Sequence, residues 1–151
     1  MAEMTDAGFM EIAMEEAIRA FQEGEVPVGA VVVRNGAILG KAHNLRESTH
    51  DPSAHAEILA LRAATRVSDS WRLLDATIYV TKEPCIMCSG AIINSRISRL
   101  VYGCKDIKAG GVDSLYRILS DSRLNHQVTV VPGVLADECA ALLQRFFRER
   151  R

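Results

Sequence analysis

The sequence contains no long apolar run and no stretch typical of an export signal. Nowhere does it approach the ~18 or more consecutive apolar residues that a membrane span requires, so no membrane association is expected. The first residues, MAEMTDAGFMEIAMEEA, are acidic and lack a basic segment followed by an apolar one, which excludes the usual secretory pattern. We therefore expect a cytoplasmic protein.

An excess of positive charge is also missing. The formal net charge is −1, which argues against a protein that coats nucleic acid through bulk electrostatic attraction. Two local basic patches remain, one at residues 145–151 and a smaller one at Lys105 and Lys108. Any contact with nucleic acid is therefore expected to be local.

Cysteine is scarce, with four residues, Cys85, Cys88, Cys104 and Cys139. An even count in a small secreted protein would suggest disulfides. In a chain of cytoplasmic character with 48% hydrophobic residues, metal binding or catalysis is the better interpretation.

The chain has no internal repeat and no linker rich in Pro, Gly or Ser, so its 151 residues are expected to form one domain, residues 1–151. Helices are expected at residues 8–23, 54–65, 85–94, 113–119 and 136–148. Strands are expected at residues 28–33, 37–42, 77–81, 99–102 and 128–131. An Asn35-Gly36 turn makes the first two strands an antiparallel pair. The later strand–helix alternation predicts a three-layer α/β fold with a mixed sheet.

Four residues suggest metal chemistry: His55, Glu57, Cys85 and Cys88. Zinc prefers nitrogen and sulfur ligands in a tetrahedral shell, and a catalytic zinc leaves the fourth position for water. Cys85 and Cys88 are three apart and share one face of a helix. Pro84 suits the start of that helix, where the positive end of the helix dipole stabilises thiolates.

The spacing of His55 and Glu57 adds a geometric condition. A separation of two residues along a helix corresponds to about 200° of rotation, so in mid-helix the two side chains would point to opposite sides. Both can face one site only if the end of the helix points at the metal. Capping signals at Asp51 to Ser53 place them in the first turn. The sequence thus predicts two helix N-termini converging on one zinc ion.

This arrangement suits hydrolytic deamination. Zinc held by two thiolates and one imidazole polarises bound water and can lower its pKa to about 7. Glu57, near the metal without ligating it, can accept the proton, pass it to a ring nitrogen and then to the leaving amine. Attack on an amidine-like carbon then releases ammonia.

Other interpretations of these residues exist. The Cys85–Cys88 pair could be a redox pair, which would leave His55 and Glu57 unexplained. A structural zinc would require a fourth protein ligand, which His43, His50 or Cys104 could supply. A histidine such as His55 could also be a buried core residue.

Beyond these residues, longer segments resemble the bacterial tRNA-specific adenosine deaminases, a branch of the cytidine deaminase-like superfamily, over nearly the whole chain. The segments that carry the resemblance are EVPVGA at 25–30, Asn44, DPSAHAE at 51–57, EPCIMC at 83–88, Asn125-His126 and LADECA at 135–140. The H-x-E and P-C-x-x-C motif alone is specific only to the superfamily, and the extended match points to tRNA.

The resemblance implies a single CMP/dCMP deaminase-type zinc-binding domain with a three-layer α/β/α fold and a five-stranded mixed sheet. It implies a homodimer with one Zn²⁺ per subunit, bound by His55, Cys85 and Cys88, with Glu57 as the catalytic residue. The implied reaction converts the wobble adenosine of a tRNA anticodon arm to inosine.

The resemblance also implies substrate contacts. Asn44 is expected to hydrogen-bond the flipped adenine, and Val28 and the backbone at Ala56 and Pro84 are expected to line its pocket. Asp106 and Lys108 are expected to meet the sugar–phosphate of neighbouring nucleotides. The last helix is expected to lie beside the anticodon loop with Phe147, Arg148 and Arg150, although these arginines could equally be a solvated helix end.

Some residues depart from the family pattern. Lys82 stands where many relatives carry an apolar residue, Cys104 replaces a small residue, and residues 107–114 differ in detail. Two rival functions follow: deamination of a free base or nucleotide such as guanine or cytosine, and a non-catalytic RNA-binding subunit that kept its zinc for folding. The intact Glu57 argues against the second rival.

Overall fold

The computed structural model describes residues 4–150. The helices are α1 (Asp6–Gln22), α2 (Arg46–Thr49), α3 (Ala56–Ser68), α4 (Ile86–Asn94) and α5 (Ala136–Glu149), with a short 3₁₀ turn, η1 (Ile118–Ser120). The strands are β1 (Gly29–Arg34), β2 (Ala37–His43), β3 (Ala76–Lys82), β4 (Arg99–Cys104) and β5 (Thr129–Val131).

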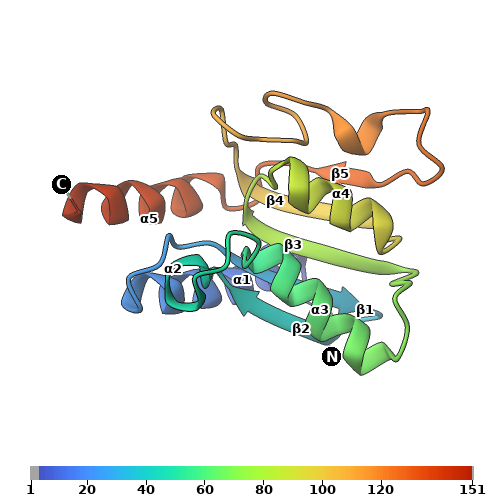
Figure 1. Ribbon diagram of the computed structural model, residues 1–151, viewed down its shortest axis with the longest axis horizontal. Helices are drawn as coiled ribbons and strands as arrows, with labels where there is room; N and C mark the ends of the chain where they lie inside the picture. Colours follow the sequence, from blue (N-terminus) through green and yellow to red (C-terminus); the bar gives the residue numbers. More distant parts are fainter. Residues whose placement is uncertain (1–3, 151) are drawn as a thin grey trace.

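The five strands form one mixed sheet in the order β2-β1-β3-β4-β5 (Figure 1). β1 pairs antiparallel with β2 and with β3, whereas β3, β4 and β5 run parallel. Asn35 and Gly36 form the tight turn between β1 and β2, both with positive φ (50° and 76°), the conformation that a two-residue hairpin of this kind requires. The expected antiparallel start and mixed sheet are confirmed.

Helices cover both faces of the sheet, which gives the predicted three-layer α/β/α fold (Figure 1). Alternation along β1 decides which residue faces which layer. Val32 packs in the core beneath α3 and α4, and Val31 packs in the core beneath α1 and α5. The run of β-branched residues in β1 is therefore buried on both faces, as a central strand requires.

Three local expectations are wrong. The helix expected from residue 54 begins at Ala56, because Asp51 accepts hydrogen bonds from the Ser53 backbone N–H and hydroxyl instead of capping the helix. The polar loop expected after residue 43 contains the short helix α2. Residues 113–119 form turns and only the first two residues of η1, because the backbone N–H groups of Leu115, Tyr116 and Ile118 donate to the carbonyls of Gly110 and Gly111, five to seven residues earlier instead of four.

The carboxyl ends of β3 and β4 lie at one edge of the sheet, together with the start of β1 and the end of β2. Binding sites in α/β folds form outside the carboxyl ends of parallel strands. Among residues 4–150, no helix is both long enough and apolar enough to cross a membrane.

Candidate active site

Two helices begin at the same point of this edge and bring the predicted metal ligands together. His55 is the N-cap of α3 and Cys85 is the N-cap of α4, both with extended backbone. Cys88 lies in the first turn of α4 and is fully buried. The two helix N-termini therefore converge, and the positive ends of both dipoles point at the site.

The spacing of the donor atoms fits zinc. The His55 Nδ1 lies 3.6 Å from the Cys85 Sγ and 3.5 Å from the Cys88 Sγ. Zn–N bonds of about 2.0–2.1 Å and Zn–S bonds of about 2.3 Å at a tetrahedral angle put nitrogen and sulfur about 3.6 Å apart. All three ligand atoms lie within 4.8 Å of one another. The donor set and its dimensions therefore match three corners of a tetrahedral zinc shell.

The thiols differ in their electrostatic environment. A hydrogen bond from the Cys88 thiol, supported by one from His55, lowers the pKa of Cys85 to about 3, although burial opposes this. The same interaction, together with burial, raises the pKa of the Cys88 thiol. The site thus favours a thiolate at Cys85, and thiolate is the form that binds metal.

Glu57 stands in the first turn of α3 beside this cluster. It is 4% exposed, and burial raises the pKa of its carboxyl group. In the described residues, the three-donor cluster consists of His55, Cys85 and Cys88, so Glu57 remains outside it. A carboxyl group placed in this way can take up and release a proton near a polarised water.

A cavity of about 260 Å³ opens at this point. It is slightly smaller than the ~300–1,000 Å³ of typical small-molecule pockets, and this suits a single base better than a whole nucleotide. Besides the metal ligands His55 and Cys85, its walls include six predicted site residues: Val28, Asn44, Ala56, Glu57, Asp106 and Phe147. They also include residues that the sequence did not single out as contacts: Val26, Arg46, Lys82, Glu83 and Ala109.

Asn44 is held by the backbone around it. Its Nδ2 donates to the Val26 carbonyl at 3.3 Å, and its Oδ1 accepts from the Arg46 N–H at 3.2 Å. An amide side chain has two donor hydrogens and two acceptor lone pairs, so these two bonds use one of each. Asn44 therefore orders the turn after β2 and can still bind a ligand.

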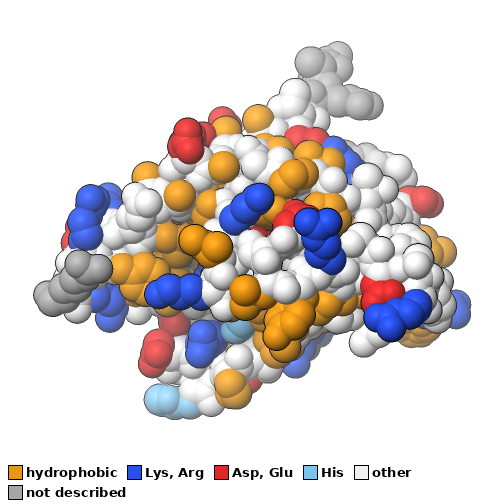
Figure 2. Space-filling view, turned by 90° about the horizontal axis from the view of Figure 1, so that it is seen from above, with side chains coloured by type: hydrophobic (Ala, Val, Ile, Leu, Met, Phe, Trp, Pro, Cys, Tyr) orange, Lys and Arg blue, Asp and Glu red, His pale blue; other side chains and the backbone are white. Residues whose placement is uncertain are grey.

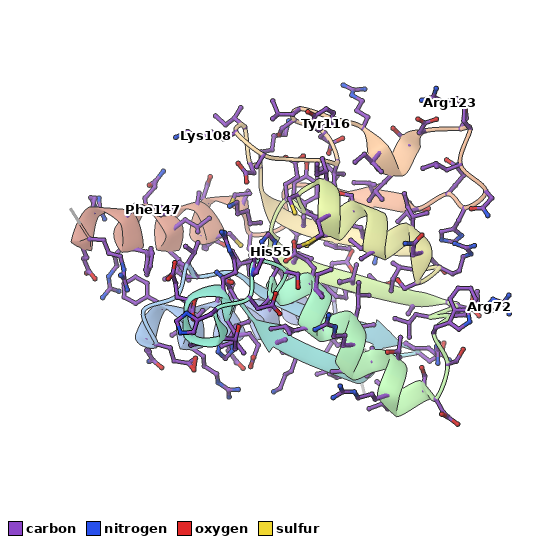
Figure 3. All side chains as sticks on the ribbon, in the orientation of Figure 1. His55, Arg72, Lys108, Tyr116, Arg123 and Phe147 are labelled. Atoms are coloured by element: carbon purple, nitrogen blue, oxygen red, sulfur yellow. The ribbon has the colours of Figure 1, made fainter. Side chains whose placement is uncertain are left out.

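Phe146 and Phe147 are adjacent on α5 and therefore point in directions about 100° apart. Phe146 is 5% exposed and packs edge-on against Phe21, whereas Phe147 is 49% exposed and lines the cavity. Figure 3 shows Phe147 on α5 and Lys108 on the loop after β4, both toward the end of the sheet at which His55 lies.

Four predicted contact residues lie outside the cavity walls in the described part of the chain: Pro84, Lys108, Arg148 and Arg150. Arg150 has a clear structural partner, because its guanidinium donates to the Gly24 carbonyl at 2.7 Å and lies over the ring of Phe146. Lys108 and Arg148 are exposed. On the face drawn in Figure 2, Lys and Arg side chains are scattered among apolar and acidic ones and form no continuous basic surface.

Two buried glutamates, Glu25 and Glu83, shape the walls, and sequence reasoning missed both roles. The Glu25 carboxylate accepts hydrogen bonds from the backbone N–H groups of Glu47 and Ser48 at the start of α2. Burial alone would raise the pKa of Glu83, but hydrogen bonds from the loop after β4 hold it below its usual value. The position of Glu83 directly before Pro84-Cys85 was the one available signal.

Known proteins are similar to this chain along nearly its whole length. The sequence matches the MafB19-like deaminase family over residues 4–151. It is 50% identical over 143 residues to a tRNA-specific adenosine deaminase of Streptococcus pyogenes serotype M1, covering 95% of this chain and 84% of that protein. It is 48% identical over 146 residues to the tRNA-specific adenosine deaminase of Bacillus subtilis strain 168, covering 97% of this chain and 91% of that protein.

A solved structure agrees with these relatives. It comes from studies of A-to-I editing by tRNA:A34 deaminases at the wobble position, and it superposes with a TM-score of 0.85 at 41% identity, covering 89% of this chain and 97% of that one. The fold, the His-Cys-Cys cluster and the sequence identities to these relatives support the same conclusion: the chain belongs to the family of tRNA-specific adenosine deaminases.

Proposed function

We propose that this chain hydrolyses the wobble adenosine of a tRNA anticodon to inosine and ammonia, with one Zn²⁺ per subunit held by His55, Cys85 and Cys88. One observation carries the proposal: three donors at zinc-ligand spacing stand beside the buried carboxyl of Glu57, in a cavity of about 260 Å³.

The residues of the chain divide the work. A zinc ion bound there would act as a Lewis acid that lowers the pKa of a bound water to about 7. Glu57 takes one proton from the water side of the cavity to a ring nitrogen and then carries the second proton of that water to the leaving amine, which departs as ammonia. Its burial excludes bulk water, so the proton stays within the site.

The cavity walls would hold the base. Val28 and Ala56 flank the ring, and the free donor and acceptor of Asn44 bind its polar edge. Phe147 offers a half-exposed aromatic surface at the rim, and aromatic stacking is a common way to hold an unpaired base.

Polar and basic residues on the cavity wall and beyond it would contact the anticodon arm. Asp106 and Lys108 meet the sugar–phosphate of neighbouring nucleotides, and Arg148 and Arg150 lie along the loop from α5. Because the bases of an anticodon loop are already single-stranded, extruding one costs little.

We further propose that residues 1–151 work as one CMP/dCMP deaminase-type zinc-binding domain and that two copies form a homodimer. A tRNA substrate would place this enzyme in the cytoplasm.

The test uses purified protein of known zinc content and an anticodon stem-loop RNA with adenosine at the wobble position. Ammonia release together with an A-to-G change on sequencing is expected, since inosine is read as guanosine. Guanine, cytosine and their nucleotides are assayed in parallel. Deamination of a free base without reaction of the RNA would assign the site to a small-molecule deaminase. RNA binding without turnover would make the chain a non-catalytic subunit.

A further inference from the structure

The carboxylate of Glu83 is surrounded by hydrogen-bond donors of one loop. Glu83 is 2% exposed. Its Oε2 accepts the backbone N–H groups of Val112, Asp113 and Ser114 at 3.1, 2.8 and 3.0 Å. Its Oε1 accepts the backbone N–H of Asp106 at 3.1 Å and the hydroxyl of Ser114. Both ends of the loop of residues 106–114, which follows β4, are therefore tied to one side chain.

The loop also approaches Glu83 and its neighbours at very short range. A Cβ added to Gly110 would lie 2.3 Å from the Glu83 Oε2, so only glycine fits against the carboxylate. The Gly111 N–H donates to the Pro84 carbonyl at 2.8 Å. These contacts hold the loop against the residues that directly precede the metal ligand Cys85.

The fixed loop supplies one wall of the cavity. Asp106 and Ala109 line it. The Asp106 Oδ1 accepts the backbone N–H groups of Lys108 and Ala109, both at 3.1 Å, and its Oδ2 lies 3.1 Å from the Lys82 Nζ. The orientation of the Asp106 side chain therefore depends on a backbone that Glu83 holds in place.

We infer that Glu83 is a positioning residue for substrate recognition: it holds the loop of residues 106–114 against the Pro84-Cys85 turn, so that Asp106 and Ala109 form the wall that meets the RNA. This inference rests on the proposed function. Both oxygens of Glu83 are engaged by the loop, so it acts through that wall.

A carboxylate is required because four of its five partners are backbone N–H groups, which can only donate. In Glu83→Gln, one oxygen becomes an NH₂ group that faces N–H donors, so at least part of the ring of hydrogen bonds is lost. Loss of a hydrogen bond to a charged group should raise KM for the anticodon stem-loop by about tenfold. The zinc cluster and Glu57 are untouched, so kcat should stay within about threefold and zinc content should stay at the wild-type value.

Asp6→Asn is a matched control for general destabilisation. Asp6 is a carboxylate that accepts hydrogen bonds from the Tyr79 hydroxyl at 2.8 Å and Arg99 Nη1 at 2.9 Å. Arg99 begins β4, so this network contacts the sheet at the edge opposite the cavity. Asp6→Asn should lower Tm and leave KM unchanged. If Glu83→Gln behaves in the same way, Glu83 is merely structural and the inference is overturned.

A double-mutant cycle examines the contact itself. Gly110→Ala should raise KM in the wild-type background, because its Cβ collides with the carboxylate. In Glu83→Ala the carboxylate is gone, so adding Gly110→Ala should change KM by less than about twofold further. Equal effects in both backgrounds would contradict the proposed contact.

Proteolysis separates failure of the inference from failure of the proposed function. Trypsin should cut at the exposed Lys105 and Lys108 faster in Glu83→Gln than in Asp6→Asn or wild type, and this readout requires no RNA. If wild-type protein fails to deaminate the stem-loop, the proposed function is refuted while the cleavage rates still decide whether Glu83 holds the loop. Equal cleavage in all three proteins would overturn the inference.

Discussion

Replacing Glu57 with glutamine isolates the proton-transfer role of this residue. The amide has nearly the same shape as the carboxyl group but cannot accept the proton. Glu57 is 4% exposed, and burial raises the pKa of its carboxyl group. Replacing it with an uncharged amide therefore places no new charge in a buried site. The variant should fold, bind zinc and bind RNA.

The magnitude follows from the role. A positioned general acid–base group typically contributes 10²–10⁴-fold, so kcat should fall by about that factor. At 1.36 kcal/mol for each factor of ten, the activation barrier should rise by about 2.7–5.4 kcal/mol. Zinc should stay at one per chain, because Glu57 is outside the three-donor cluster in the described residues. Tm should move by less than about 4 °C, the upper shift that 1 kcal/mol produces in a chain of this size.

Single-turnover deamination of the stem-loop RNA, metal analysis and thermal unfolding measure these three quantities. Glu47→Gln is the matched control, since Glu47 is an exposed glutamate on α2 near the cavity and its replacement removes the same charge. It should keep wild-type kcat. Zinc loss in Glu57→Gln would make Glu57 a ligand, and a kcat near wild type would refute its role as proton carrier.

Three further outcomes are expected. Cys88→Ser should lower zinc content and Tm together, because metal-binding energy is also folding energy. Cys139→Ala, which removes a buried thiol outside the cluster, should lower Tm and leave zinc content unchanged. Metal analysis and a melting curve of each variant measure these two quantities. Phe147→Ala should weaken stem-loop binding by about 1–3 kcal/mol in a titration if the ring stacks on a base, and unchanged affinity would remove that contact. Arg148→Glu should reduce the salt-dependence slope of RNA binding by about 1, and an unchanged slope would assign the residue to the solvated surface. Arg150 is less suitable for this test, because its guanidinium also holds the Gly24 carbonyl.

Local pattern predicted most of the secondary structure. The β-branched run and the Asn35-Gly36 turn predict β1, β2 and their antiparallel pairing, and the structure contains them. The expected helix at residues 113–119 fails for a non-local reason. Glu83, about 30 residues earlier, fixes the backbone of residues 112–114, and the N–H groups of Leu115 and Tyr116 donate to the Gly110 carbonyl rather than to carbonyls four residues before them. No window of sequence reports so distant a partner.

The sequence by itself determined the chemistry available to the protein: an imidazole, two thiols three residues apart and a carboxyl, with spacing that requires helix ends rather than helix middles. Only the tertiary structure decided how these groups meet. His55 and Cys85 lie 30 residues apart. The antiparallel pairings of β1 with β2 and with β3 bring the carboxyl ends of β2 and β3, the strands that precede these two residues, to the same end of the sheet. The cavity walls depend on long-range hydrogen bonds to Glu25 and Glu83, because a buried carboxylate must find donors wherever the fold supplies them.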